Sequence, residues 1–248
     1  MAVVSVDLAY RHYHDIGIAI LHSEQDTIRC KFIQPGQLGL SGAPTPELLA
    51  EALVKICSDN ASRLILIDGP QAWKDPFNGI ENSRLCERAL NTPAKTGLPG
   101  RVKPANYGPF VTFSVALFDQ LANRGWTRLD NRALLDVRPY HLVLESFPLS
   151  AWSALGIPRL PAKAKASTSD IKDRGLELKR RFPLQLASEP NHDELQALVA
   201  GLAGIGLELE DMGRYTVVGA NPRLVEGIWR EGFIINPRCE PTQRVGNV

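Results

Sequence analysis

The amino-acid sequence predicts an α/β fold in which helices flank a mixed β-sheet. Short apolar runs rich in Val, Ile and Leu, typical of strands, alternate with longer segments of helical periodicity. The early strands follow one another through short turns, whereas the later ones are separated by helices. Short connections favour antiparallel neighbours and helical crossovers favour parallel ones, so we expect both orientations in one sheet.

The elements of the N-terminal third follow from their apolar pattern. Each predicted strand is a run of β-branched and other apolar residues bounded by a turn or a polar segment. The helix carries Leu and Ile on one face. The last strand, RLILID, is apolar almost throughout, as in strands buried on both faces of a parallel sheet. In order, the sequence predicts strands at 3–9, 15–21 and 27–33, a helix at 46–57 and a strand at 63–68.

Helices and two irregular segments dominate the rest of the chain. Proline and glycine are frequent in segment 91–109, which predicts a long loop or lid. Segment 156–190 is basic and punctuated by proline, and we expect it to be an insertion in a single domain spanning 1–248. The other expected elements are helices at 79–90, 110–126, about 170–182 and 192–210, a strand at 141–148 and a small C-terminal strand pair at 215–219 and 232–236.

Composition limits the classes of function. The 248 residues are 44% hydrophobic and carry a formal net charge of +1, so charge neither indicates nor excludes a nucleic-acid partner. The longest apolar stretch, 195–207, is too short to span a bilayer, and the N-terminus lacks the basic start of a signal peptide. The four cysteines show no metal-binding spacing. We therefore expect a soluble, cytoplasmic protein with no membrane partner.

Three predicted strands carry one acid near the carboxyl end. VVSVDLA contains Asp7, RLILIDGP contains Asp68 and HLVLESFP contains Glu145. Ligands of α/β sheets bind outside the carboxyl ends of parallel strands, so these acids would converge there if the three strands are parallel neighbours. Converging carboxylates repel one another, and they need protons, basic partners or a metal such as Mg²⁺. The alternative, in which each acid only ends a strand or caps a turn, stays open.

The last predicted helix supplies a fourth acid. Asp193 lies in its first turn and Gln196 one turn later, at the start of a stripe of small residues that includes Gly204. Small residues let a helix backbone approach a sheet closely, so both polar side chains would point to the same sheet edge. Asp193 as an ordinary helix-capping residue is the alternative.

These residues, in this order, resemble the RNase H-like superfamily. The more specific resemblance is to the family named domain of unknown function 429, whose members are predicted RNase H-like nucleases. The resemblance implies a five-stranded mixed sheet of order 3-2-1-4-5 flanked by helices. It rests on VDLA (6–9), IDGP (67–70), ENSRLCERAL (81–90), VLESFP (143–148), HDELQALVAGLAG (192–204) and the tail from VVGA (217–220) to EGFIINP (231–237), which together span nearly the whole chain.

The resemblance also implies a metal-dependent nuclease that hydrolyses phosphodiester bonds of DNA or RNA. Two Mg²⁺ or Mn²⁺ ions would be held by four catalytic carboxylates, with Asp7 bridging both ions. Gln196 departs from the pattern, because related resolvases tend to carry a second acid there. Its carbonyl oxygen can still coordinate a metal, but without charge. The metal ligands implied are Asp7, Asp68, Glu145, Asp193 and Gln196.

Basic residues near these acids suggest where nucleic acid binds. Segment 156–182 has eight Lys or Arg against three acids, and a smaller basic cluster accompanies Tyr107 in the long loop. Basic side chains with aromatic neighbours suit a nucleic-acid channel. A solvated basic face is the alternative. Arg84 would either neutralise the acids or hold a phosphate, and a surface ion pair is the alternative for this residue. The nucleic-acid contacts expected are Lys163, Lys165, Arg101, Lys103 and Arg84.

Two other functions remain open from the sequence. One is a non-catalytic nucleic-acid-binding module on the same fold, which Gln196 favours. The other is a phosphotransferase of the actin-like or sugar-kinase type. That class needs a glycine-rich phosphate loop after the first acid, and the residues here are LAYRHYH, without glycine.

Overall fold

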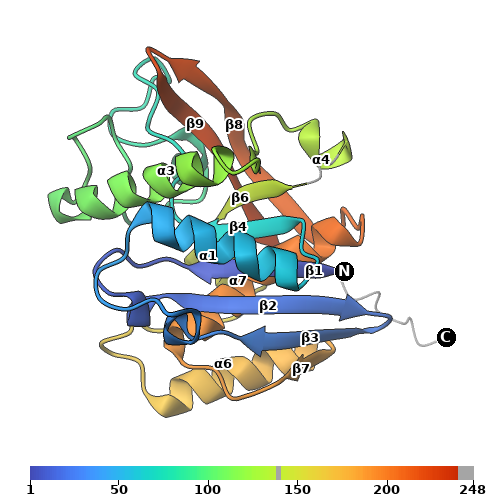
Figure 1. Ribbon diagram of the computed structural model, residues 1–248. Helices are drawn as coiled ribbons and strands as arrows, with labels where there is room; N and C mark the ends of the chain where they lie inside the picture. Colours follow the sequence, from blue (N-terminus) through green and yellow to red (C-terminus); the bar gives the residue numbers. More distant parts are fainter. Residues whose placement is uncertain (138–140, 240–248) are drawn as a thin grey trace.

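A mixed β-sheet forms the centre of the protein, and helices cover both of its faces (Figure 1). The computed structural model describes residues 1–137 and 141–239. Helices α1 (Pro46–Asp59) and α3 (Gly108–Ala122) lie on one face, and α7 (His192–Glu208) lies on the other (Figure 1). The predicted α/β class, with a mixed sheet flanked by helices, is confirmed.

The first three strands are antiparallel, as the short turns predict. They are β1 (Ala2–Asp7), β2 (Gly17–Glu24) and β3 (Thr27–Phe32). On its other side, β1 pairs in parallel with β4 (Leu64–Asp68), which pairs in parallel with β6 (Leu142–Ser146). The three strands that end in acidic sequence are therefore consecutive parallel neighbours.

The sheet is larger than the five strands that the resemblance implies. Its order is β7-β3-β2-β1-β4-β6-β9-β8, and β5 (Thr127–Arg128) also pairs with β6. The five-stranded order 3-2-1-4-5 is thus wrong for the sheet as a whole. The short strand β7 (Leu184–Leu186) extends one edge, and the C-terminal hairpin extends the other.

The C-terminal strand pair is long and belongs to the main sheet. Strands β8 (Tyr215–Val225) and β9 (Ile228–Pro237) pair antiparallel with an irregularity between Ala220 and Arg223. Strand β9 also pairs in parallel with β6. The polar residues around the irregularity hide the strand in the sequence, because its hydrophobic alternation is interrupted there.

Helix α2 (Leu85–Ala89) is much shorter than the predicted 79–90. The residues before it form a loop held by the buried Glu231 carboxylate. This carboxylate accepts hydrogen bonds from the backbone N–H groups of Asp75 (3.0 Å) and Leu85 (2.8 Å) and from the Asn78 amide (2.6 Å). Backbone N–H groups that bond a distant carboxylate satisfy their hydrogen-bonding need without a helix.

The other short elements complete the fold. They are the helical turns η1 (Tyr13–Asp15), η2 (Pro35–Leu38) and η3 (Ala105–Tyr107), and the helices α4 (Leu134–Val137), α5 (Pro148–Ala154) and α6 (Thr168–Arg181). Apart from η3 and an isolated bridge between Lys95 and Lys103, the predicted loop 91–109 is irregular up to the start of α3.

Strand residues alternate between two apolar cores, one on each face of the sheet. Val4, Val6 and Ile67 pack with α1 and α3, whereas Val3 and Leu66 pack with α7. This alternation decides which of the acidic side chains can meet, because successive residues of a strand point to opposite faces.

Helix α7 lies unusually close to the sheet because three positions lack a side chain. A Cβ added to Gly204 would lie 2.6 Å from Val3 Cγ1, and one added to Gly201 would lie 2.6 Å from Leu21 Cδ1. A Cβ on Gly17 would lie 2.2 Å from the backbone carbon of Asp193. The stripe of small residues thus permits the close approach expected from the sequence.

Among the residues described, no helix is both long enough and apolar enough to cross a membrane.

Candidate functional site

Asp7 and Asp68 form a carboxylate pair at the carboxyl ends of two neighbouring strands. They are register partners in the parallel ladder of β1 and β4, so their side chains leave the sheet on the same face. Both are half-buried and share a hydrogen bond. Burial, followed by the charges of Asp68 and Asp193, raises the pKa of Asp7 well above its ordinary value. Burial also raises the pKa of Asp68 from 3.8 to about 7.

Asp193 joins this pair from the first turn of α7. Gly17 is the register partner of Asp7 on β2, and the backbone of Asp193 packs directly against it. The Asp193 side chain is buried and close enough for its charge to raise the pKa of Asp7. The N-terminus of a helix favours a negative charge, which offsets part of the cost of placing a third acid here.

Lys163 brings a positive charge to Asp193. Its ammonium group lies 2.5 Å from Asp193 Oδ2 and 2.7 Å from Asp15 Oδ1. The hydrogen bond with Lys163 lowers the pKa of Asp15. The other oxygen of Asp193 lies 3.1 Å from Nδ1 of His192. Lys163 also opposes the raised pKa of Asp7, so its charge reaches the carboxylate pair.

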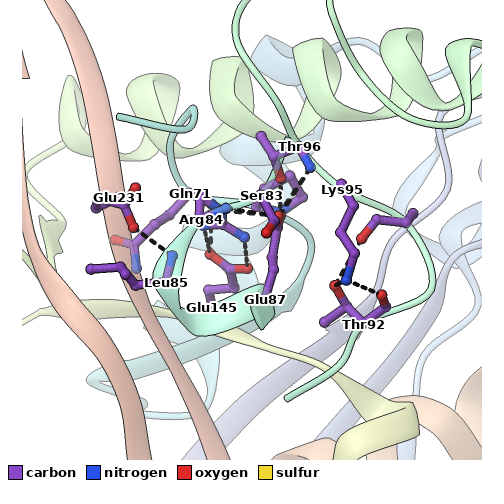
Figure 2. A network of polar contacts seen from close by, with 12 residues as sticks. Gln71, Ser83, Arg84, Leu85, Glu87, Thr92, Lys95, Thr96, Glu145 and Glu231 are labelled. Carbon is purple, nitrogen blue, oxygen red and sulfur yellow. Dashed lines mark hydrogen bonds and ion pairs between the residues drawn. The ribbon is translucent and has the colours of Figure 1, made fainter. Parts of the chain in front are cut away.

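Glu145 does not pair with Asp7 or Asp68, contrary to the convergence expected for all three strands, although it lines the same cavity as Asp68 and its charge adds to the raised pKa of Asp68. Its register partner on β4 is Ile67, not Asp68, so it points to the opposite face of the sheet. There Arg84 forms two hydrogen bonds with it, of 2.7 and 2.5 Å (Figure 2). The backbone N–H of Gln71 donates a further bond of 2.9 Å. Burial nevertheless raises the pKa of Glu145.

Arg84 neutralises buried acids, which is one of the three roles left open from the sequence. Its side chain is 1% exposed, and its Nε lies 3.1 Å from Glu87 as well. Glu87 in turn accepts hydrogen bonds from the backbone and hydroxyl of Thr96 (Figure 2). A guanidinium held by two buried carboxylates is not available to a nucleic-acid phosphate. The structure therefore does not support the predicted contact between Arg84 and nucleic acid.

Gln196 is buried one turn after Asp193 and already has a partner. Its carbonyl oxygen accepts a hydrogen bond of 2.6 Å from the indole N–H of Trp152. This is the same oxygen that a metal would need. Gln196 is therefore not a free metal ligand, because Trp152 occupies its carbonyl oxygen. Nothing in the sequence indicated this role for Trp152.

Ser146 is a further residue that sequence reasoning missed. It is the register partner of Asp68 on β6 and therefore shares its face. Its side chain is 1% exposed, and its hydroxyl has no hydrogen-bond partner among the described residues. The only sign in the sequence is that Ser146 directly follows Glu145 in LESFP. Successive side chains of a strand point to opposite faces, so Ser146 and Glu145 face opposite sides of the sheet.

The remaining basic residues lie on the surface. Lys165 and Arg101 are exposed. Lys103 is exposed too, with its ammonium group 3.8 Å from a carboxylate oxygen of Glu81. These three are accessible to a partner, whereas Lys163 is engaged by Asp15 and Asp193.

The fit of a divalent cation to these residues is partial. The structure brings together Asp7, Asp68 and Asp193, while Glu145 and Gln196 are engaged by Arg84 and Trp152. Within residues 1–137 and 141–239, no group of three or more His, Cys, Asp or Glu side chains is arranged as a metal site. Magnesium often binds through only one or two carboxylates, with water and substrate phosphates as its other ligands. The Asp7–Asp68 pair suits that mode of binding, and the five-ligand set does not.

Comparison with known proteins finds no matching family model, no matching curated protein and no matching solved structure.

Proposed function

We propose that this protein is a metal-dependent nuclease whose site is built on Asp7, Asp68 and Asp193. One observation carries the proposal: Asp7 and Asp68 face each other at the carboxyl ends of adjacent parallel strands, without a basic residue in ion-pair contact with either among the residues described. At an effective dielectric constant near 20, two ionised carboxylates 4 Å apart repel by about 4 kcal/mol. The hydrogen bond between the two side chains indicates that a shared proton relieves this repulsion in the metal-free protein, and a divalent cation would take the place of that proton.

The part of the sheet that carries the acids supports an RNase H-like arrangement. Strands β3, β2, β1, β4 and β6 are consecutive neighbours, the first three antiparallel and the last three parallel. On this interpretation β7 and the β8–β9 hairpin are additions at the two edges. The acidic pair then lies at the centre of the sheet, where ligands of α/β proteins bind.

Each residue of the site has a definite task in this proposal. Asp7 and Asp68 would hold Mg²⁺ or Mn²⁺ at the sheet edge, and the ion would supply positive charge for the phosphate oxygens. Asp193 adds negative charge from the helix. Lys163 orients Asp193 by binding one of its oxygens, and His192 lies beside the other. Lys165, Arg101 and Lys103 provide exposed charge for the phosphates of the bound strand.

The test is cleavage of end-labelled single-stranded, duplex, hybrid and junction substrates with Mg²⁺ or Mn²⁺. Asp7→Asn keeps the shape of the side chain and removes its charge. We expect this variant to lose at least about 100-fold in rate, because several kcal/mol of transition-state stabilisation depend on the ion. Asp59→Asn, at an exposed helix position paired with Lys55, is the matched control and should cleave like wild type. Equal cleavage by wild type and Asp7→Asn would refute the proposal.

A second candidate is a nucleic-acid-binding module without catalysis. It is favoured because the chain itself engages three of the five expected ligands: Arg84 binds Glu145, Trp152 binds Gln196 and Lys163 binds Asp193. Magnesium titration separates the two candidates. If magnesium binds the site, it should raise the melting temperature of the wild type, because a magnesium concentration of 100 times Kd stabilises the folded state by about 2.7 kcal/mol. The rise should be smaller in Asp7→Asn. Binding of nucleic acid with no magnesium effect and no cleavage favours the module.

A further inference from the structure

A small cavity lies directly beside the acidic pair. It has a volume of about 220 Å³, and its wall includes Asp68 and Ser146 from the strand ends and Tyr107 from the long loop. Drug-sized ligands generally occupy pockets of about 300–1,000 Å³, so this cavity suits a smaller group. Asp68 belongs to both the acidic pair and the cavity wall, so a group in the cavity would lie next to whatever the pair binds.

The cavity wall is mostly apolar, which suits a flat ring with few polar atoms. Pro70, Phe147, Leu149 and Ile234 contribute apolar surface. The hydroxyl of Ser146 is buried without a partner among the described residues, so it is free to bond the polar edge of a ligand. Arg84, Glu87 and Glu145 also line the cavity, and the single guanidinium is shared by the two glutamates, so with Asp68 the charged groups of the wall are mainly acidic. An anionic ligand therefore gains little here.

A second hollow adjoins the first, and its lining includes two tyrosines and one arginine. It has a volume of about 440 Å³ and shares Pro93, Ala94 and Tyr107 with the cavity. Its other side is formed by Tyr10 and Arg11, which follow Asp7 in the chain by three and four positions. The two hollows therefore lie on either side of the same loop residues.

Stacking interactions already order the aromatic residues of this hollow. Tyr107 stacks on Phe110 with ring centroids 4.8 Å apart, and Tyr10 meets Phe110 edge-on at 6.4 Å. The Arg11 guanidinium lies 5.5 Å from the centre of the Tyr10 ring. Tyr10 and Tyr107 are half-buried and Arg11 is exposed, so ring and guanidinium surface remains for a ligand. Nucleobases stack on aromatic and arginine planes of this kind.

We propose that the cavity beside Asp68 takes one unpaired nucleobase, and that Tyr10, Arg11 and Tyr107 stack the next base of the same strand. This inference rests on the proposed nuclease function and names its substrate class: single-stranded nucleic acid. A base in a duplex is stacked between its neighbours and paired with its partner. It would have to leave the helix, at a cost of a few kcal/mol, to enter such a cavity. A duplex should therefore bind more weakly than a single strand of the same sequence.

The test compares a fluorescent single strand with an all-abasic strand of the same length, which keeps the phosphates and removes every base. Affinities are measured by fluorescence anisotropy in EDTA, so that no cleavage occurs, and a duplex of the same sequence forms the third arm. We expect the wild type to prefer the normal strand to the abasic strand by at least about 30-fold, since each of the two bound bases contributes about 1–3 kcal/mol.

Two substitutions place this preference in the cavity. Ala94 lines both hollows and is half-buried, so Ala94→Trp should fill them and abolish the preference for bases. Ala187→Trp, at an exposed position beside β7, is the matched control and should keep it. Arg11→Ala, on the surface, should weaken the preference without affecting folding.

The outcomes separate this inference from the proposed function. Equal affinity of wild type for normal and abasic strands would overturn the inference, as would a preference that Ala94→Trp retains. Cleavage that depends on Asp7 would in those cases leave the nuclease proposal intact. Absence of Asp7-dependent cleavage on all substrates, together with a base preference lost in Ala94→Trp, would instead support the cavity as a base site in a binding module.

Discussion

Two acidic regions lie one strand apart and differ in how their charge is balanced. Glu145 and Glu87 share the buried guanidinium of Arg84 and accept further hydrogen bonds from the backbone (Figure 2). Asp7 and Asp68, on the other face of the sheet, have mainly each other. Both sets sit at strand ends, and from the sequence they look alike. The partner that each finds in the fold separates a structural network from a candidate site.

The comparison shows where ligand-binding capacity remains. A buried ion pair with complete hydrogen bonding has little left to offer a ligand, whereas half-buried carboxylates without a basic partner gain from a cation. Burial is the main cause of the raised pKa values of Asp7 and Asp68, and for Asp7 the charges of Asp68 and Asp193 add to it. The following changes are ordered from the largest expected effect to the smallest.

Removing Arg84 should break the structural network most severely. Arg84→Met leaves Glu87 and Glu145 buried without their cation, and loss of one partner of a buried pair costs about 3–5 kcal/mol. Urea unfolding measures the change. Arg180→Met, at an exposed position paired with Glu177, should change the free energy of unfolding by at most about 0.5 kcal/mol. A similar small change in Arg84→Met would show that the network is not structural.

Adding one methyl group at Gly17 should disturb the candidate site through the backbone. The Cβ of Gly17→Ala would lie 2.2 Å from Asp193, so the start of α7 must move, at a cost of about 1–3 kcal/mol. Gly36→Ala meets nothing within 4 Å and serves as the control. Thermal unfolding and the magnesium-induced shift in melting temperature are the readouts. If Gly17→Ala matches Gly36→Ala in both, the close packing does not position Asp193.

The carboxylate pair should make stability depend on pH. Because the pKa of Asp68 is raised from 3.8 to about 7 in the folded protein, the folded state binds more protons than the unfolded state between these values. The associated stability is fully present below about pH 4 and is lost as pH rises through 7. In the metal-free protein, Asp68→Asn should reduce this loss of stability with rising pH. The melting temperature of the variant minus that of the wild type should therefore increase from pH 5 to pH 8.

Magnesium provides the internal check on that pH dependence. Binding requires ionised carboxylates, so magnesium should stabilise wild type more at pH 8 than at pH 5 and should have little effect on Asp68→Asn. A magnesium effect of the same size in both proteins would place the ion elsewhere.

The smallest effects concern the surface cations. Lys165→Ala and Arg101→Ala should each lower the slope of log affinity against log salt by about 0.7 for a single strand if each side chain contacts one phosphate. The control is Lys55→Ala, which removes an exposed charge paired with Asp59. Slopes equal to that of the control would exclude these two residues from the nucleic-acid contact.

The sequence by itself determined the secondary structure that carries the acids. The apolar runs before Asp7, Asp68 and Glu145 are strands, and the helix that begins at His192 brings small residues against the sheet, because burial demands these periodicities. The α/β class follows from the same pattern, whereas the structure shows that β1, β4 and β6 are parallel neighbours. Local sequence was informative wherever one face of an element had to be apolar.

Only the tertiary structure decided which acids meet and which are neutralised. Glu145 precedes its strand end by one residue, and a shift of one residue turns a side chain to the other face of the sheet. The partners of Glu145, Gln196 and Asp193 come from distant segments, namely Arg84, Trp152 and Lys163. The length of β8 and β9 also depends on pairing across the sheet. Long-range contacts of this kind leave no periodic trace in the chain, which is why the fold was needed to separate the candidate site from the network beside it.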